Sequence, residues 1–452
     1  MPESAEVIVV GSGPGGATVA RELARAGRRV LIVERGADHR GRWYHGTHLG
    51  ALRYTERGGL LFTREGLQIV RPLMVGGATA LYCASAALPP PWLKEQYDID
   101  LEADASAAAE ELGVAPLDEE LRGEASTRIA RAAQTVGQRW EPQPKFFRPE
   151  RADRFRCGAH CMLGCRCGAK WSAAEYVDQA VEAGARLVTG TRIERVLAEG
   201  GRAKGVIGRR GRARFEARAE VVVLAAGGLG SPPILRRSGL EEAGRGLAMD
   251  TTVMVYGVAA GPGIGREPPM TWSWEDPRGR FMLSTLIDPW LLFPLMAFLA
   301  HPRHLLRWPR WGRMLGVMIK VRDQVSGSIG DDASITKPLT ETDRKVLEEA
   351  GGLARSILLA AGAAPDTLFT TPLRGTHPSG TVRLGEMVDE NLQTEIKGLY
   401  VCDASVFPQA LGRPTVLTII GLAKRLARHV GILRGFIRRS TQKSGADRRI
   451  HS

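Results

Sequence analysis

Apolar and polar positions at the start of the chain follow the order strand, helix, strand. Residues 6–10, which are apolar after Glu6, and residues 30–33 are short runs that predict buried strands. Between them, residues 17–26 place apolar side chains at helical spacing until Gly27 ends the helix. The pattern therefore predicts a βαβ unit, in which the two strands are parallel.

The middle of the chain predicts further elements of both kinds. Ser172 and Glu175 have the spacing of a capping box, which predicts a helix that ends at Gly184. Three strands separated by glycine-rich turns are expected next, at residues 192–198, 203–207 and 212–217. The apolar run 221–226 has the character of a parallel strand that is buried on both faces. Another helix is predicted from about Thr340 to just before Gly362.

Two long segments lack this regular alternation of predicted strands and helices, and they are richer in Trp and Pro. They are residues 89–156 and 246–374, and we expect them to form a second, interleaved domain. The first domain is then discontinuous, and its three parts are residues 1–88, 157–245 and 375–435. Residues 436–452 form a basic C-terminal tail.

Length and charge narrow the possible binding partners and the cellular location of the protein. A chain of 452 residues can bury a large core. The net charge of +13 would suit nucleic acid, an anionic membrane surface or a well-solvated arginine-rich surface. No nucleic-acid-binding motif accompanies it, so we expect no nucleic-acid partner. Residues 1–6 show no export leader, and the cysteines are clustered rather than dispersed, which favours a reducing, cytoplasmic location.

Glycines follow the first predicted strand in the pattern Gly11-x-Gly13-x-x-Gly16. The first glycine permits a tight turn, the second a close approach of a pyrophosphate, and the third close packing of helix on strand. Glu34 ends the next strand, where a carboxylate can accept hydrogen bonds from ribose hydroxyls. A purely structural turn is the alternative, but this placement favours a dinucleotide cofactor.

A second group of motifs lies near the C-terminus. Residues 375–381 read GTHPSGT, residues 399–408 read LYVCDASVFP, and residues 412–415 read GRPT. Together with the N-terminal glycines, these motifs resemble the glucose-methanol-choline (GMC) oxidoreductases, flavoenzymes that oxidise alcohols, and among them the long-chain alcohol oxidases. The segments 71–81 and 226–239 are similar to two further family motifs.

The resemblance implies a doubly wound, Rossmann-like FAD domain in a mixed α/β fold, with an antiparallel sheet in the interleaved substrate domain. It also implies noncovalent FAD, because Leu81 stands about where some members carry a flavin-linked histidine. The residues expected to contact the cofactor are Gly11, Gly13, Pro14, Gly15, Gly16, Glu34, Arg35, Gly76, Gly77, Ala226, Gly227, Asp403, Ala404, Pro414 and Thr415.

The resemblance also assigns catalytic residues. His377 matches the family's catalytic base, and an imidazole can accept a hydroxyl proton at neutral pH. Pro414 suits the first turn of a helix whose amides can stabilise negative charge. Relatives usually carry Asn or His where this chain has Arg413, a permanent cation. Arg413 could bind a carboxylate, contact reduced flavin, or point to solvent while a neighbour takes the role.

Four cysteines are crowded into one turn, at Cys157, Cys161, Cys165 and Cys167. Their spacing lacks the paired halves of a structural zinc site. The turn resembles the cysteine-rich turn of long-chain alcohol oxidases and also one that holds an iron–sulfur cluster in some family members. Free thiols in a tight turn and a cluster both remain open. A cluster would pass electrons on to a quinone or cytochrome.

Residues 289–322 combine an apolar run with arginine and tryptophan and contain no acidic residue. The run is too short to span a bilayer, which needs about 20 apolar residues. It could lie at the inner face of a membrane as a peripheral contact, or pack into the substrate domain while its arginines face solvent.

These observations predict FAD-dependent oxidation of a CH–OH group on an apolar alcohol, such as a long-chain or polycyclic one. One alternative is a flavoenzyme that acts on a carboxylate-bearing lipid through Arg413. The other is a membrane-associated flavoprotein without catalysis.

Overall fold

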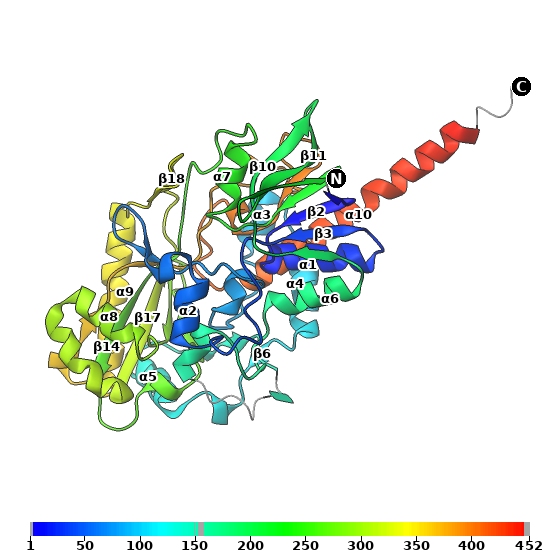
Figure 1. Ribbon diagram of the computed structural model, residues 1–452. Helices are drawn as coiled ribbons and strands as arrows, with labels where there is room; N and C mark the ends of the chain where they lie inside the picture. Colours follow the sequence, from blue (N-terminus) through cyan, green and yellow to red (C-terminus); the bar gives the residue numbers. More distant parts are fainter. Residues whose placement is uncertain (1–2, 149, 152–157, 447–452) are drawn as a thin grey trace, which may run out of the picture.

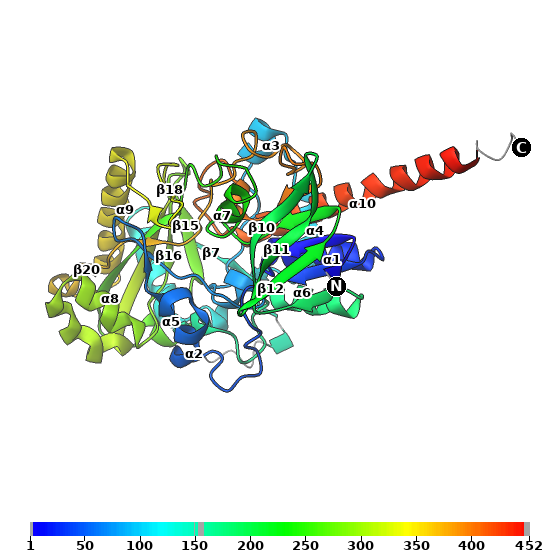
Figure 2. The same cartoon turned by 45° about the horizontal axis from the view of Figure 1, so that its top comes forward.

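A computed structural model describes residues 3–148, 150–151 and 158–446 of the chain (Figure 1). Two large buried cores surround two separate sheets, one parallel and one mainly antiparallel. Seen from a second direction, the antiparallel sheet with α8 and α9 stays at one end, and α1, α4 and α10 stay at the other (Figure 2). The fold is a mixed α/β fold, as the sequence predicts.

The parallel sheet is built from apolar strands that are buried on both faces. Its order is β22-β13-β2-β3-β9, and every neighbouring pair is parallel. The bounds are β2 Val7–Val10, β3 Val30–Val33, β9 Arg186–Val188, β13 Val221–Leu224 and β22 Leu399–Val401. The three predicted strands of this sheet, β2, β3 and β13, are confirmed within a few residues.

Helices cover one side of the parallel sheet. α1 (Pro14–Arg25) packs against α6 (Ala173–Glu182) and against α10 (Val416–Ala446). The Ser172–Glu175 capping box opens α6 as predicted. α10 continues to Ala446 and so includes much of the segment that the sequence assigns to a basic tail.

A small antiparallel sheet covers the other side. It consists of β10 (Thr191–Glu199), β11 (Arg202–Arg210) and β12 (Ala213–Arg218), and β11 contacts β13 of the parallel sheet. β1 (Glu3–Ser4) pairs with the edge of β12. All three predicted strands are therefore present, and the structure shows that they pair in antiparallel fashion.

The larger sheet has nine strands within the described residues. Its bounds are β4 Leu61–Phe62, β5 Gln68–Ile69, β7 Glu141–Pro142, β14 Thr251–Val258, β15 Trp272–Glu275, β16 Phe281–Thr285, β17 Met314–Val321, β20 Phe369–Thr370 and β21 Arg374–Gly375. α9 (Glu341–Ala360) packs on β14 and β17, and α5 (Glu124–Thr135) packs beside it. Because β4 and β5 belong to this sheet, the chain crosses between the two sheets within residues 1–88.

Several shorter elements connect these layers. Their bounds are α2 His48–Tyr54, α3 Trp92–Tyr97, α4 Glu102–Glu111, α7 Ser231–Arg236, α8 Leu292–Ala300, the 3-10 helix η7 Pro302–Arg313, β6 Ala115–Pro116, β8 Pro144–Lys145, β18 Ser328–Ile329 and β19 Ile335–Thr336. Strand β21 pairs with β14, with Gly375 opposite Thr251. This pairing brings two segments that are distant in sequence to the same edge, and the active-site candidates lie just beyond it.

Candidate active site

The glycine-rich loop joins β2 to the start of α1. Gly13 is the N-cap residue, Pro14 occupies the first turn, and no side chain caps the helix. The first turn also contains no acidic residue. The first amides of α1 therefore lack a side-chain acceptor, which leaves them suited to an anion.

Three of these glycines are required because another part of the backbone lies too close to leave room for a side chain. A Cβ at Gly11 would lie 2.3 Å from the Ala225 carbonyl oxygen, and one at Gly15 would lie 2.0 Å from that of Cys402. A Cβ at Gly16 would lie 2.1 Å from the Gly11 oxygen. At Gly13, by contrast, a Cβ would meet no atom within 4 Å, so this position borders open space at the helix start.

The Gly76–Gly77 turn passes directly beside this loop. Both residues have positive φ, at 92° and 54°. The Gly76 amide donates to Ser12 Oγ at 3.2 Å, and a Cβ at Gly77 would lie 3.0 Å from the Gly13 Cα. The Gly76–Gly77 turn and the glycine-rich loop are thus brought together although more than sixty residues of chain separate them.

Asp403 ties the C-terminal motif to the segment that contains Ala226 and Gly227. Its carboxylate accepts hydrogen bonds from the Gly227 amide at 2.9 Å, from Ser231 Oγ at 2.6 Å and from the Ser405 amide at 2.8 Å. The Ala226 amide donates to the same Ser231 hydroxyl, and Ala404 begins a single 3-10 turn after Asp403.

Glu34 is buried at the end of β3, and its carboxylate holds the glycine-rich loop. It accepts from the Ser12 amide and hydroxyl and from the Gly36 amide, at 2.6–3.0 Å. Burial raises the pKa of Glu34, while these hydrogen bonds lower it. An ionised carboxylate has about four acceptor sites, so one remains for a ribose hydroxyl. Arg35 points to a different partner and pairs with Glu56 at 3.1 Å.

These groups fit a dinucleotide. The uncapped start of α1 offers amide donors, Gly13 leaves room in front of them, and Glu34 is an acceptor at the end of the neighbouring strand. The donor and acceptor types match a pyrophosphate and a ribose, respectively.

His377 lies at the other end of the candidate site, two residues after the end of β21. Its Nδ1 lies 2.6 Å from Oδ2 of Asp250, and one-quarter of the His377 side chain is exposed. Because a carboxylate accepts, Nδ1 carries the proton and donates, which leaves Nε2 as the acceptor. Burial and the ammonium group of Lys320 lower the pKa of His377, and Asp250 acts in the opposite direction. The ring is therefore neutral at pH 7.

Asp250 also reaches the segment that contains Arg413. Its Oδ1 accepts from the Gly412 amide at 2.8 Å. One carboxylate thus joins residues 377 and 412, which belong to two of the three C-terminal motifs. The Arg413 side chain itself pairs with Glu275 at 2.6 Å. Pro414 and Thr415 lead directly into α10.

Asp250 has an unusual backbone, with φ at 47°. Asp323 fixes this conformation from both sides, because its carboxylate accepts from the Met249 amide at 2.9 Å and from the Thr251 amide at 3.0 Å. Burial raises the pKa of Asp323 to about 6, so it is ionised at neutral pH. Lys337 Nζ lies 3.7 Å from it and supplies a counter-charge.

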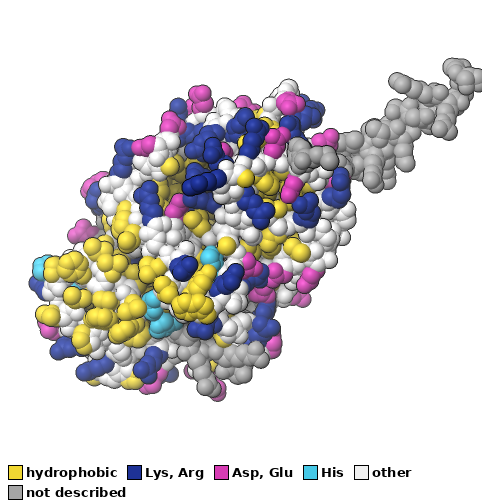
Figure 3. Space-filling model, viewed as in Figure 1, with side chains coloured by type: hydrophobic (Ala, Val, Ile, Leu, Met, Phe, Trp, Pro, Cys, Tyr) yellow, Lys and Arg dark blue, Asp and Glu magenta, His cyan; other side chains and the backbone are white. Residues whose placement is uncertain are grey.

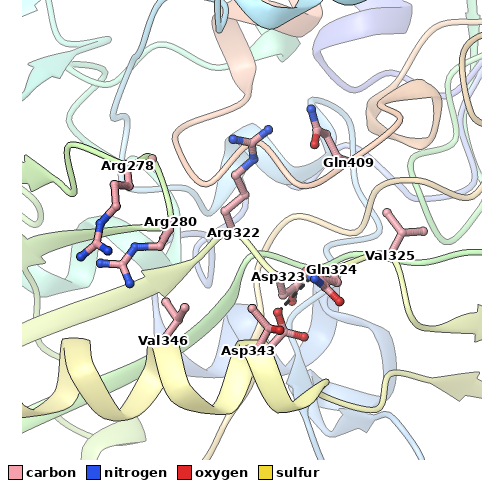
Figure 4. A pocket seen from close by; sticks show the side chains of 11 residues that line it. Arg278, Arg280, Arg322, Asp323, Gln324, Val325, Asp343, Val346 and Gln409 are labelled. Carbon is pink, nitrogen blue, oxygen red and sulfur yellow. Dashed lines mark hydrogen bonds between the residues drawn. The ribbon is translucent and has the colours of Figure 1, made fainter.

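Asp323 also lines a cavity of about 360 Å³ (Figure 4). Arg278, Arg280 and Arg322 lie along the same cavity, together with Gln324 and Gln409. A second cavity, of about 70 Å³, is lined in part by Glu275, Gly412 and Arg413. Residues of α8 and η7 line neither of these two cavities, so their apolar side chains do not form these walls.

Lys320 adds a buried cation beside His377. Its Nζ donates to Thr376 Oγ1 at 2.8 Å, and burial lowers the pKa of Lys320. No pattern in the sequence points to Asp250, Lys320 or Asp323. Each is a single charged residue at a strand end, without motif or spacing, and only the pairing of β14 with β17 and β21 brings them together.

The His377 segment is anchored to the glycine-rich end by backbone packing. A Cβ at Gly228 would lie 2.0 Å from the Pro378 carbonyl oxygen. Thr381 Oγ1 donates to the Gly228 oxygen at 2.8 Å, and the Val382 amide donates to the Ser405 oxygen at 2.9 Å. The His377 loop and the Asp403 turn therefore belong to one packed unit.

The cysteine turn is only partly within the described residues, since Cys157 lies outside them. Cys165 Sγ and Cys167 Sγ are 3.7 Å apart, and Cys161 is buried nearby in the 3-10 helix Gly158–Leu163. Among residues 3–148, 150–151 and 158–446, no group of three or more His, Cys, Asp or Glu side chains is arranged to hold a metal ion. The iron–sulfur hypothesis thus gains no support from this geometry.

Comparison with known families agrees with this architecture. The N-terminal part of the GMC oxidoreductase family matches residues 85–267, and its C-terminal part matches residues 335–423. An NAD(P)-binding Rossmann-like domain matches residues 9–69. The two GMC matches together cover more than half of the chain. The protein belongs to the GMC oxidoreductases.

Several curated relatives align over most of the chain. An uncharacterized GMC-type oxidoreductase of Mycobacterium tuberculosis is 28% identical over 94% of this chain and 75% of that protein. An uncharacterized protein of Methanocaldococcus jannaschii is 27% identical over 93% of this chain and 98% of its own length. Long-chain-alcohol oxidase FAO4B of Arabidopsis thaliana is 26% identical over 92% of this chain, which spans 65% of that protein.

A solved structure shares this fold. Pyridoxine 4-oxidase from Mesorbium loti superposes with a TM-score of 0.68, at 17% identity, over 94% of this chain and 99% of that one. At this identity the likeness concerns the fold. It extends across both sheets, because nearly the whole of each chain is included.

Proposed function

We propose that this GMC oxidoreductase uses noncovalent FAD to oxidise the CH–OH group of an apolar alcohol, with His377 as the base. The observation that carries the proposal is the Asp250–His377 pair, in which the ring is neutral, oriented and one-quarter exposed. Such a ring is prepared to accept a hydroxyl proton.

The residues that would hold FAD are those of the nucleotide end. The α1 amides would bind the pyrophosphate, and Glu34 a ribose hydroxyl. The Asp403 turn and the start of α10, beyond Pro414 and Thr415, would lie along the rest of the cofactor. Bound flavin supplies an acceptor for the hydride that leaves the alcohol carbon.

The protein's own side chains would accept the proton that the substrate hydroxyl loses. His377 Nε2 accepts the hydroxyl proton, and Asp250 stabilises the imidazolium that results. Asp250 also fixes which nitrogen is free, because Nδ1 is occupied by the carboxylate. General-base catalysis of this kind contributes roughly 10²–10⁴-fold to a rate.

The apolar character of the substrate is supported by the curated relatives, several of which are long-chain-alcohol oxidases of Arabidopsis thaliana. The alternative, a carboxylate-bearing lipid bound by Arg413, requires its carboxylate to displace Glu275 from that arginine. This displacement makes the neutral alcohol the better-supported substrate.

An anaerobic reduction screen tests the proposal. Purified holoprotein is mixed with dodecanol, a sterol, glucose or an ω-hydroxy fatty acid, and flavin bleaching is followed. We expect dodecanol or the sterol to bleach the flavin, His377→Ala to abolish bleaching, and His429→Ala, a half-buried histidine on α10, to leave it unchanged. Bleaching by the ω-hydroxy acid alone, with its loss in Arg413→Ala, would favour the alternative. Bound flavin that no alcohol reduces would contradict both.

A further inference from the structure

Helix α8 is apolar on both its inner and its outer face. Phe293, Met296 and Ala297 point into the core, and the Phe293 ring lies 5.3 Å from that of Tyr256. On the outside, Leu295 and Phe298 are exposed, and no residue of Leu292–Ala300 is polar. A helix on a water-facing surface ordinarily carries polar side chains on its outer face. The outer face of α8 is therefore made for a less polar environment.

The exposed apolar residues continue from α8 onto its neighbours. The Leu291 amide donates to His48 Nε2 of α2 at 3.4 Å, which joins the two helices. Sixteen large hydrophobic side chains are exposed among the described residues, and ten of them belong to this region. These ten, which we call the apolar surface, are Trp43, Leu49, Leu52, Trp290, Leu291, Leu295, Phe298, Leu299, Leu305 and Leu306. Hydrophobic side chains gather over α8 and α2 on the face shown in Figure 3.

Cations and tryptophans border the apolar surface. Arg53, Arg303 and Arg310 are exposed, and they form no ion pair with any described residue. Residues 289–322 contain no Asp or Glu to oppose them. Trp308 Nε1 donates to the Trp290 carbonyl oxygen at 3.1 Å, with the two rings 4.9 Å apart. Arginines without an acidic partner, beside apolar and indole side chains, complement an anionic lipid surface.

We propose that the apolar surface docks this protein on an anionic phospholipid membrane. α8 has nine residues, about 14 Å of helix, whereas crossing a bilayer core needs ~30 Å. Within the described part of the chain, no helix meets the length and hydrophobicity required to cross. The apolar surface therefore lies in the plane of the headgroups, with Leu and Phe at the acyl boundary and the arginines against phosphate.

The docking surface is held rigidly to the catalytic segment. Asp288, just before this region, forms a two-bond ion pair with Arg374, both bonds at 2.6 Å. Trp311 Nε1 donates to the Asp288 carbonyl oxygen at 3.0 Å. Arg374 precedes His377 by three residues, so a docked protein presents its active site at a fixed orientation to the membrane.

Vesicle sedimentation tests this proposal because it measures membrane binding and does not depend on enzyme activity. Holoprotein is mixed with vesicles of phosphatidylcholine, or of phosphatidylcholine and phosphatidylglycerol in equal amounts. The test variant combines Phe298→Gln, Leu299→Gln and Leu306→Gln. The matched control combines Leu88→Gln, Val181→Gln and Leu359→Gln, which are exposed elsewhere; Leu359 is 42% exposed and Leu299 is 47%.

We expect the wild type and the control to bind the anionic vesicles, with an affinity that falls as the salt concentration rises. The test variant should bind these vesicles with an affinity at least about tenfold lower than that of the wild type. The flavin spectrum and melting temperature of each variant report that it is folded. The proposal is overturned if the wild type binds neither vesicle, or if the test and control variants bind alike. It is also overturned if light scattering shows a wild-type dimer that the test variant converts to monomer, because the surface then joins two copies.

Discussion

Two regions of this protein, the proposed nucleotide end around residues 11–16 and the proposed catalytic end around His377 and Asp250, are built in different ways. At the nucleotide end, residues 11–16 are contiguous. They contribute backbone amides at the start of α1, and their glycines lack the Cβ atoms that would prevent close backbone approach. At the catalytic end, His377 meets Asp250 across 127 residues, and both work through side chains. A local motif encodes the first, whereas the pairing of two strands creates the second. Substitutions should therefore act differently at the two ends.

The largest effect is expected from Gly15→Val at the nucleotide end. A Cβ there would lie 2.0 Å from the Cys402 carbonyl oxygen, and neither backbone can move without separating α1 from β22. We expect loss of folded holoprotein, measured as flavin retained after gel filtration. Full flavin content and an unchanged melting temperature would show that the close packing is not required.

Asp250→Asn should break the catalytic end while it spares the nucleotide end. An amide in place of the carboxylate no longer stabilises the imidazolium or selects the Nδ1-protonated ring. We expect kcat to fall by roughly 10²–10⁴-fold with the flavin content unchanged. A variant that retains wild-type kcat would remove Asp250 from the proposed mechanism.

Gly13→Ala sharpens the comparison, because this glycine borders open space rather than protein. A Cβ would touch nothing within 4 Å, so the fold should be kept. The added methyl group lies where a pyrophosphate approaches the helix start, and we expect FAD affinity to fall by roughly 10–100-fold. Flavin titration of the apoprotein measures this, and a loss of folding instead would place Gly13 with Gly15.

The smallest effect is expected from Glu275→Gln, which leaves Arg413 without its partner. Both side chains are partly exposed, and such ion pairs contribute little to stability, in general about 0–1 kcal/mol. We expect a melting temperature within a few degrees of wild type and kcat/KM within about tenfold for neutral alcohols. A rate loss as large as that of Asp250→Asn would place Arg413 in the chemistry.

The sequence predicts the nucleotide end in detail because its signals are local. The apolar runs near residues 7–10 and 30–33 become β2 and β3. Local signals also work on the antiparallel sheet, where the helix predicted to begin near Thr340 is α9, capped by Thr340 and Asp343. The family motifs are also local, which is why the GMC resemblance is confirmed.

The catalytic end is less predictable because its partners depend on tertiary structure. Asp250 carries a positive φ that the sequence does not reveal, and it contacts His377 only because β14 pairs with β21. The 289–322 segment shows the same limit. Phe293 and Met296 enter the core, as the interpretation that packs this run into the substrate domain predicts, whereas Leu295 and Phe298 stay outside. Contact of the outer face with a membrane stays a prediction.

The pH dependence of flavin reduction tests the Asp250–His377 base most directly. Reduction is measured anaerobically with an alcohol substrate, in wild type and in Asp250→Asn. Only the neutral ring accepts a proton, and burial holds the pKa of His377 below its ordinary 6.5. The wild-type rate should therefore rise through a pKa below 6.5 and stay level above it. In Asp250→Asn, where the stabilising anion is lost, this pKa should fall further as the rate drops. An acid limb above 6.5, or one that Asp250→Asn leaves in place, would contradict the account.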